Sequence, residues 1–285
     1  MDIGVAGAPP SAAEPAIEAA FAAVARVHRC MSFHERASDL SRINREARER
    51  AVRVDPWTFA VLQAALDLNR RSAGAFDVAV APALQRMGVL PRLADEAPSA
   101  AACASADDIE LLDGCRVRFR RPSMAIDLGG IAKGFAVDRA VDALREHAMP
   151  SGLVNAGGDL KAFGPQPHTV HVRDPRDAGR LICAVELREE ALATSGGRFD
   201  PFRSGNPLAT TIIDPATGRP AQAAAGATVR AVSCMIADAL TKVVAVAPER
   251  ATALLDRLDA GALVVLADGD IRISRHWQDT VRLAA

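Results

Sequence analysis

The sequence contains no tyrosine, so a site that stacks an aromatic ligand must use Phe, His, Trp or an aliphatic surface instead. It also has no surplus of positive charge, because 34 basic and 35 acidic residues leave a formal net charge of -1. Such a balance does not favour the neutralisation of nucleic-acid phosphates or of an anionic membrane surface. We therefore expect no nucleic acid among the partners of this protein.

Cysteine clusters and long apolar runs are missing as well. The five cysteines are an odd number without a Cys-x-x-Cys pair, which disfavours a zinc site and fits a reducing compartment. No stretch approaches the ~20 apolar residues of a membrane span, and residues 1–15 lack the basic and apolar regions of an export signal. We expect a chain without a membrane span, cytoplasmic as written, although a removed export signal would leave the same sequence.

The composition is that of a globular protein, with 49% hydrophobic and 24% charged residues in a chain of 285. We expect a single domain over 1–285, with residues 1–13 disordered or truncated. Periodicity and turn signals predict helices over 14–31, 56–73, 131–147, 235–246 and 248–258. They predict strands over 116–119, 124–127, 152–155, 169–173, 181–187, 209–213, 228–232, 263–266 and 271–274, and a polar turn between the first two helices. Helices and strands do not alternate regularly, which favours an α+β fold.

The segment around 125–138 carries the clearest sign of a ligand site. A predicted strand leads to Asp127, and the pair Gly129-Gly130 then opens a helix whose free N–H groups can face an anion. Lys133 is one of only three lysines and lies one turn into that helix. The pattern suits a phosphate ester, while a tight turn with a solvated lysine is the alternative.

A second glycine pair follows the strand expected over 152–155. Gly157-Gly158 precedes Asp159, so a ligand could approach the backbone closely there. A hairpin corner in which Asp159 accepts hydrogen bonds from local backbone donors is an equally good interpretation.

A third candidate lies on the helix expected over 235–246. Thr241 and Lys242 follow Asp238 by three and four residues, so the three side chains can share one helical face. The flanking sequence is almost uncharged, which favours a buried functional pair over a solvated one.

Seven segments, in order along nearly the whole chain, resemble a known family. They are SFHERASDLSRIN (32–44), GAFDVAVAP (74–82), IDLGGIAKGFAVD (126–138), VNAGGD (154–159), ATSG (193–196), IIDPATGRP (212–220) and ADAL (237–240). The sequence is similar to the FAD:protein FMN transferases of the ApbE family, which remove AMP from FAD and attach FMN through a phosphoester bond to a Thr or Ser of a target flavoprotein.

The resemblance implies an α+β fold of mixed or antiparallel sheets packed against helices, and a flavin transferase with FAD as substrate. It implies that His34, Ala75, Phe76, Asp77, Asp127, Lys133, Thr211 and Ile212 contact FAD. It also implies that Gly130, through its carbonyl, and Asp238 hold Mg²⁺, an ion that prefers oxygen ligands. Asp238 and Lys242 would then be the catalytic side chains.

The sequence departs from the family pattern at four places. His34 replaces a Tyr, Thr211 replaces a His, and Lys242 replaces a Thr that ligates the metal, with Thr241 one position earlier. A strand that carries a Met-Gly-Thr flavin contact is not recognisable in residues 1–15. An ammonium group cannot ligate a cation, so either Lys242 pairs with Asp238 in the metal position, or it turns to a phosphate while Thr241 supplies the oxygen. We expect the first arrangement.

Three activities fit this sequence. The leading hypothesis is FMN transfer to an acceptor flavoprotein that carries a Ser/Thr-Gly-Ala-Thr type motif. FAD pyrophosphatase activity, which releases FMN and AMP, and flavin binding without turnover are the alternatives. Ala225-Gly-Ala-Thr228 resembles the acceptor motif itself, but a core strand is the preferred interpretation of that segment. The sequence identifies neither the acceptor nor the oligomeric state.

Overall fold

The computed structural model describes residues 1–91, 104–122, 124–196, 210–278 and 281–283. The helices are α1 (Pro10–Met31), α2 (Asp39–Glu46), α3 (Pro56–Arg71), α4 (Ala81–Arg86), the 3-10 turn η1 (Ala106–Asp108), α5 (Ala132–Glu146), α6 (Cys234–Val246), α7 (Pro248–Arg257) and α8 (Arg275–Gln278). The strands are β1 (Asp2–Ala6), β2 (Val52–Arg53), β3 (Ile109–Leu112), β4 (Arg116–Phe119), β5 (Ser151–Ala156), β6 (Asp159–Phe163), β7 (His168–Asp174), β8 (Asp177–Leu187), β9 (Ala191–Gly196), β10 (Ile213–Asp214), β11 (Arg219–Pro220), β12 (Ala224–Ala231), β13 (Gly261–Leu266), β14 (Ile271–Ile273) and β15 (Val281–Leu283). Among these helices, none has the length and hydropathy of a membrane span.

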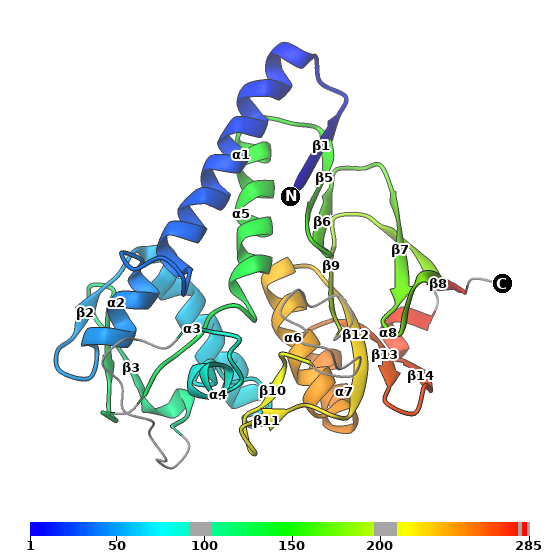
Figure 1. Ribbon diagram of the computed structural model, residues 1–285. Coiled ribbons are helices and arrows are strands. Elements are labelled where there is room, and N and C mark those ends of the chain that lie inside the picture. The colour runs from blue at the N-terminus through cyan, green and yellow to red at the C-terminus, as the bar shows by residue number, and fades with distance from the viewer. Residues whose placement is uncertain (92–103, 123, 197–209, 279–280, 284–285) are drawn as a thin grey trace.

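A seven-stranded sheet with the order β1-β5-β6-β9-β12-β13-β14 forms the centre of the fold. Every strand pairing in the described residues is antiparallel, which confirms an α+β architecture. Helices α5 and α6 cover one face, and the smaller sheet β15-β8-β7 covers the other (Figure 1). Side chains along β13 alternate between the two layers that cover the central sheet. Leu263 and Val265 face the small sheet, and Ala262 and Val264 face the helices.

Helix α1 leans along α5 and joins this sandwich to a second group of elements, α2, α3, α4 and the sheet β2-β4-β3 (Figure 1). Small buried residues make the close packing of α1 on α5 possible, among them Ala16 and Ala20. Helix α3 begins as predicted, because the Asp55 carboxylate accepts a hydrogen bond from the Trp57 amide at 2.8 Å.

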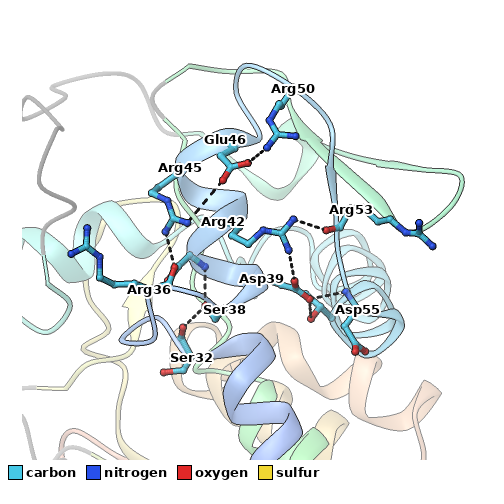
Figure 2. Close-up of polar contacts among 12 residues, drawn as sticks. Ser32, Arg36, Ser38, Asp39, Arg42, Arg45, Glu46, Arg50, Arg53 and Asp55 are labelled. Atoms are coloured by element: carbon cyan, nitrogen blue, oxygen red, sulfur yellow. Dashed lines mark hydrogen bonds and ion pairs between the residues drawn. The ribbon is translucent and has the colours of Figure 1, made fainter.

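Helix α2 replaces most of the expected polar turn between the first two helices. The Ser38 hydroxyl caps it by accepting from the Ser41 amide at 3.0 Å. Its apolar face is only Leu40 and Ile43, both fully buried, and a stripe this short is hidden among many charged residues. The Asp39 carboxylate joins the helix to α3 by accepting from the Asp55 amide at 2.7 Å (Figure 2).

Three expectations at the start and middle of the chain are wrong. Residues 1–13 are not disordered, because Asp2–Ala6 pair with β5 as the edge strand β1. The first helix starts at Pro10 rather than at residue 14, since Pro10 occupies the first helical position, where no amide donor is needed. Residues 124–127 are not a strand and have no regular secondary structure.

The remaining predicted elements are confirmed with small shifts at their ends. They are those at 56–73, 116–119, 131–147, 152–155, 169–173, 181–187, 228–232, 235–246, 248–258, 263–266 and 271–274. The strand expected over 209–213 begins outside the described residues, and within them only Ile213–Asp214 pair with β11.

Candidate active site

A cavity of about 1100 Å³ lies where the sheet, α1, α5 and the segment before α4 meet. Ten residues predicted for the site line it, namely His34, Ala75, Phe76, Asp77, Asp127, Gly130, Lys133, Thr211, Ile212 and Lys242. The other two, Asp238 and Thr241, are completely buried next to Lys242 on α6. Sequence positions that are more than 200 residues apart therefore converge on one place.

The segment 124–130 is held by a side chain rather than by a neighbouring strand. The Asn44 amide donates to the Ile126 carbonyl at 2.9 Å and its Oδ1 accepts from the Ile126 amide at 2.8 Å. This pair of bonds imitates one rung of a sheet without a strand partner. Next to it, the Asp127 amide donates to the Val78 carbonyl at 2.8 Å, so two different segments hold the chain just before the turn at Gly129.

One wall of the cavity is formed by Ala75, Phe76 and Asp77. Asn69 donates to the Phe76 carbonyl at 2.8 Å and to Asp77 Oδ2 at 3.1 Å. The same carboxylate accepts hydrogen bonds from the amides of Ala79 and Ala106, so both of its oxygens already have donors within the protein. Burial raises the pKa of Asp77, partly against these hydrogen bonds. Asp77 therefore fixes the shape of this wall.

His34 lies at the opening of the cavity on the loop between α1 and α2. The Ser38 hydroxyl donates to the Ser32 carbonyl at 2.7 Å, and Arg45 donates to the Arg36 carbonyl at 2.9 Å (Figure 2). These two bonds close the loop at both ends, while the His34 side chain itself is exposed. The loop is thus held by α2, the helix that sequence patterns did not predict.

Asp127 lines the cavity and has a strongly raised pKa. Burial raises its pKa to about 6, although a hydrogen bond from the Gly129 amide and the charges of His34 and Lys242 act in the opposite direction. The Gly129 amide donates to Asp127 Oδ2 at 3.1 Å. A group with this pKa can both take and give up a proton near neutral pH.

Lys242 forms an ion pair with Asp238, as expected. Its ammonium group donates to Asp238 Oδ1, to the Asp238 backbone carbonyl at 3.1 Å and to the Ser195 hydroxyl at 3.1 Å. Asp238 Oδ2 accepts from the Gly134 amide at 3.1 Å. The Thr241 hydroxyl is already used within the protein and is not placed as a metal ligand. It donates to the Asp238 carbonyl at 2.6 Å and lies 2.8 Å from Ser195 Oγ.

The second lysine of the site, Lys133, forms an ion pair with Asp159 at 2.5 Å. Asp159 is fully buried while the Lys133 side chain is half-exposed towards the cavity. Desolvation lowers the pKa of Lys133, but the carboxylates of Asp238 and Asp159 outweigh it and raise the pKa to about 12. Burial and the Asp238 charge raise the pKa of Asp159 to about 6 against the effect of the lysines. Asp159 is therefore more than a hairpin corner, since it sets the position of a cation.

The start of α5 offers fewer free donors than the sequence suggested. The Ala132 amide donates to the Leu128 carbonyl at 2.8 Å, and the Gly134 amide is used by Asp238. A bound anion therefore depends on the two lysines more than on the helix terminus.

Three residues with structural roles at the site were not predicted. Ser195, Asn44 and Asp138 all lie in segments that resemble the family, and the motifs were the available signal. Asp138 accepts from the amides of Cys234 and Met235 at 3.1 and 2.9 Å, from the Ser233 hydroxyl at 2.8 Å and from Lys161 at 2.8 Å. It thereby fixes the start of α6, the helix that carries Asp238.

Thr228, the last residue of the segment that resembles an acceptor motif, belongs to the central sheet. It is 3% exposed on β12 and its hydroxyl lies 3.1 Å from that of Thr194. The folded chain therefore does not present this hydroxyl to a phosphoryl group, in agreement with the expected core strand.

The residues expected to hold Mg²⁺ do not fit the ion as they are arranged. Asp238 offers three oxygens, and each already accepts a hydrogen bond, from Lys242, Gly134 or Thr241. A divalent ion at this carboxylate would also meet the positive charge of Lys242. In the described part of the chain, no group of three or more His, Cys, Asp or Glu side chains is arranged to bind a metal.

Comparison with known proteins identifies the family of this chain. Residues 1–266 match the sequence profile of the ApbE family. An FAD:protein FMN transferase of Vibrio cholerae is 28% identical over 84% of this chain and 76% of its own length. One of Rhodobacter capsulatus is 31% identical over 87% of this chain and 50% of its own.

Solved structures give the same result. The ApbE protein of Thermotoga maritima superposes with a TM-score of 0.86 at 28% identity and covers 98% of this chain and 94% of its own. The flavinyl transferase ApbE of Pseudomonas stutzeri superposes with a TM-score of 0.80 at 25% identity and covers 98% and 92%. With a profile match over 266 residues and these shared structures, the chain belongs to the ApbE family.

Proposed function

We propose that this protein is an FAD:protein FMN transferase. In the reaction, a Thr or Ser oxygen of the acceptor flavoprotein forms a bond to the phosphorus of the FMN half of FAD. The bond from that phosphorus to the bridging oxygen breaks, and AMP leaves with the electron pair. The hydroxyl proton must pass to a base, so that the products are a phosphoester-linked FMN, AMP and one proton.

The observation that carries this proposal is that one cavity combines apolar and cationic lining residues. Phe76, Val78, Leu84 and Ile212 belong to the apolar lining, which suits an isoalloxazine ring. Lys133 and Lys242 line the same cavity and suit the two phosphates. A site for riboflavin alone would need no such cations.

Asp127 is the residue that we assign to the proton. Among the described residues, two carboxylates line the cavity. Asp77 accepts from three donors of the protein, whereas Asp127 accepts from the Gly129 amide and faces the cavity. Its pKa of about 6 leaves it ionised at neutral pH and able to accept the hydroxyl proton. Thr211 cannot serve this purpose, since a threonine hydroxyl is not a base near pH 7.

The acceptor is a flavoprotein segment with a Ser/Thr-Gly-Ala-Thr type motif. An incubation with FAD and an acceptor that carries this motif separates three activities. Transfer gives protein-bound FMN and AMP, pyrophosphatase activity gives free FMN and AMP in the presence or absence of acceptor, and a binding protein gives neither. The proposal requires the first result, and a variant acceptor with Ala for the last Thr of the motif should stay unlabelled.

The role of Lys133 in phosphate binding is tested by comparing FAD with riboflavin. Lys133→Ala should weaken FAD binding by about 10- to 100-fold, because a hydrogen bond to a charged group is lost. Riboflavin binding should stay within about twofold, since riboflavin has no phosphate. Equal losses for both ligands in a fluorescence titration would contradict the assignment of phosphate binding to Lys133.

Magnesium was expected at Asp238, with Gly130 and Thr241, but the donor set does not fit the ion, and we derive no step through it. We also propose that residues 1–285 fold as one domain. Its support is that β1, near one end of the chain, and β14, near the other, belong to the same sheet.

A further inference from the structure

We propose that the ammonium group of Lys242 is the fixed cation at the phosphate end of the cavity, so that cleavage of FAD requires no divalent metal at Asp238. This inference rests on the proposed function and deepens it, because it names the group that counters the charge of the diphosphate. It differs from the metal-assisted chemistry that the family resemblance implies.

The surroundings of the ammonium group are those of a bound cation. A lysine side chain has three N–H donors, and here each has an oxygen acceptor. One is a carboxylate oxygen and one a backbone carbonyl, both of Asp238, and the third is the hydroxyl of Ser195. Carboxylate, carbonyl and hydroxyl oxygens are also the ligands that a hard metal ion takes in proteins. The ammonium group thus occupies the position where such an ion would bind.

Asp238 cannot easily release Lys242 for a metal. Its side chain is completely buried, and Oδ2 is held by the Gly134 amide at 3.1 Å. Rotation of the carboxylate would break that bond and leave a buried charge without a partner, which is costly. The ion pair is therefore a fixed part of α6 rather than a flexible surface contact.

The stem of Lys242 reaches the cavity alongside Gly130. A β-carbon at residue 130 would lie 3.4 Å from Lys242 Cε, so the lysine stem passes within van der Waals contact of this position. The Lys242 side chain is 18% exposed and belongs to the cavity lining. The charge is therefore both held by the protein and accessible to a ligand.

This arrangement can serve the proposed reaction directly. While the bond between the two phosphates breaks, negative charge grows on the bridging oxygen that leaves with AMP. A positive group held in place before the reaction stabilises this charge without reorganisation. The N–H directed at Ser195 is the one available for the phosphate, because that bond is to a neutral hydroxyl whereas the other two are to Asp238.

The experiment compares the unmodified protein with Lys242→Met and Lys242→Thr, in EDTA and in Mg²⁺. It follows FAD affinity by fluorescence, AMP release in the presence of the acceptor by chromatography, and Mg²⁺ binding without FAD by calorimetry. The unmodified protein should bind FAD and release AMP equally in both buffers, within about twofold. Lys242→Met should lose about 10²- to 10³-fold in AMP release in both buffers, the usual loss when one donor to a developing oxyanion is removed.

Lys242→Thr is the most informative variant, because it replaces the cation by an oxygen next to a freed carboxylate. It should bind Mg²⁺ without FAD and release AMP in Mg²⁺ only, whereas the unmodified protein should bind no Mg²⁺ at millimolar concentration. Arg118→Met, which removes a cation from β4 outside the cavity lining, is the matched control and should behave like the unmodified protein.

Two results would overturn the inference. If EDTA stops AMP release by the unmodified protein while Mg²⁺ supports FMN transfer, the metal is required, and the proposed function stands without this inference. If no condition gives AMP release with the acceptor, the proposed function is wrong, and calorimetry then tests the placement of the cation alone. Mg²⁺ binding by the unmodified protein as tight as by Lys242→Thr overturns that placement, and no Mg²⁺ binding by the unmodified protein supports it. Should Lys242→Met fail to fold because Asp238 is left buried and unpaired, Lys242→Met combined with Asp238→Asn removes both charges and is measured in its place.

Discussion

Gly134 on α5 lies against the backbone of Cys234 at the start of α6, so closely that a β-carbon at residue 134 would be 2.2 Å from the Cys234 carbonyl oxygen. Only glycine permits the two helices to approach in this way. The same approach brings the Gly134 amide within 3.1 Å of Asp238 Oδ2. A contact between two helices thus sets the position of a carboxylate at the site.

Gly134→Ala should destabilise the protein and displace α6 from α5. The added methyl group meets backbone atoms that cannot rotate away, so we expect a loss of about 1–3 kcal/mol or more in the free energy of unfolding. Urea unfolding measures it, with Gly4→Ala on β1 as the control, because a β-carbon there has no atom within 4 Å. Equal stability of the two variants would contradict the close approach of the helices.

Asp138→Asn should destabilise the protein by about 3–5 kcal/mol, because Lys161 remains buried without its carboxylate and α6 loses charge-assisted bonds at its start. Adding Lys161→Met should restore part of the loss. Asp142→Asn, on the same helix in a half-exposed ion pair with Arg139, is the control and should change stability by less than about 1 kcal/mol. A loss in Asp138→Asn no greater than in this control would show that the buried pair contributes little.

The stability of the protein should depend on pH through Asp127. The folded pKa of this acid, about 6, lies above its value in an unfolded chain, so the folded state binds the proton more tightly. This contribution is therefore favourable at low pH and is lost as the pH rises from about 4 to about 6. Asp127→Asn should raise the free energy of unfolding at pH 7 by at most ~3 kcal/mol.

The difference between Asp127→Asn and the unmodified protein should shrink as the pH approaches 4. Asp159, whose pKa is also raised to about 6, adds a trend of the same sign in both proteins, so the difference isolates Asp127. A difference that does not change with pH would mean that the carboxyl of Asp127 keeps an ordinary pKa. The same variant should lose FMN transfer if Asp127 accepts the proton.

His34→Ala should weaken FAD binding by about 2- to 10-fold, the range expected for loss of one aromatic contact. His34 lies exposed at the cavity opening, where the flavin ring of FAD can reach it. Quenching of flavin fluorescence should decrease in the same titration. Unchanged affinity and quenching would identify His34 as an exposed loop residue without contact to the ligand.

Elements with their own local signal could be predicted from sequence. Asp55 and Pro56 mark the start of α3, and the uncharged, apolar sequence of α6 marks a buried helix. Elements that depend on a partner elsewhere in the fold could not be predicted from their own sequence. Residues 124–127 have the composition of a strand, but their partner is the Asn44 side chain, 82 positions away.

Sequence motifs predicted which residues come together at the cavity, but not the hydrogen bonds between them. Residues of six of the seven motif segments line the cavity, and the seventh, 237–240, lies in the middle of α6 shortly before Lys242. Helical spacing also predicted that Lys242 could meet Asp238. It could not show that Ser195, from a strand 47 residues earlier, completes the set of acceptors around the ammonium group.

The edge position of β1 has a practical consequence for work on this protein. Met1 precedes β1, is 42% exposed and contributes to the lining of the same cavity that holds His34 and Lys133. A purification tag or reporter fused ahead of Met1 would therefore extend from the rim of the cavity and crowd the path by which an acceptor segment enters. A comparison of fused and tag-free protein should accordingly show slower labelling of a folded acceptor by the fusion, while the binding of free FAD changes less.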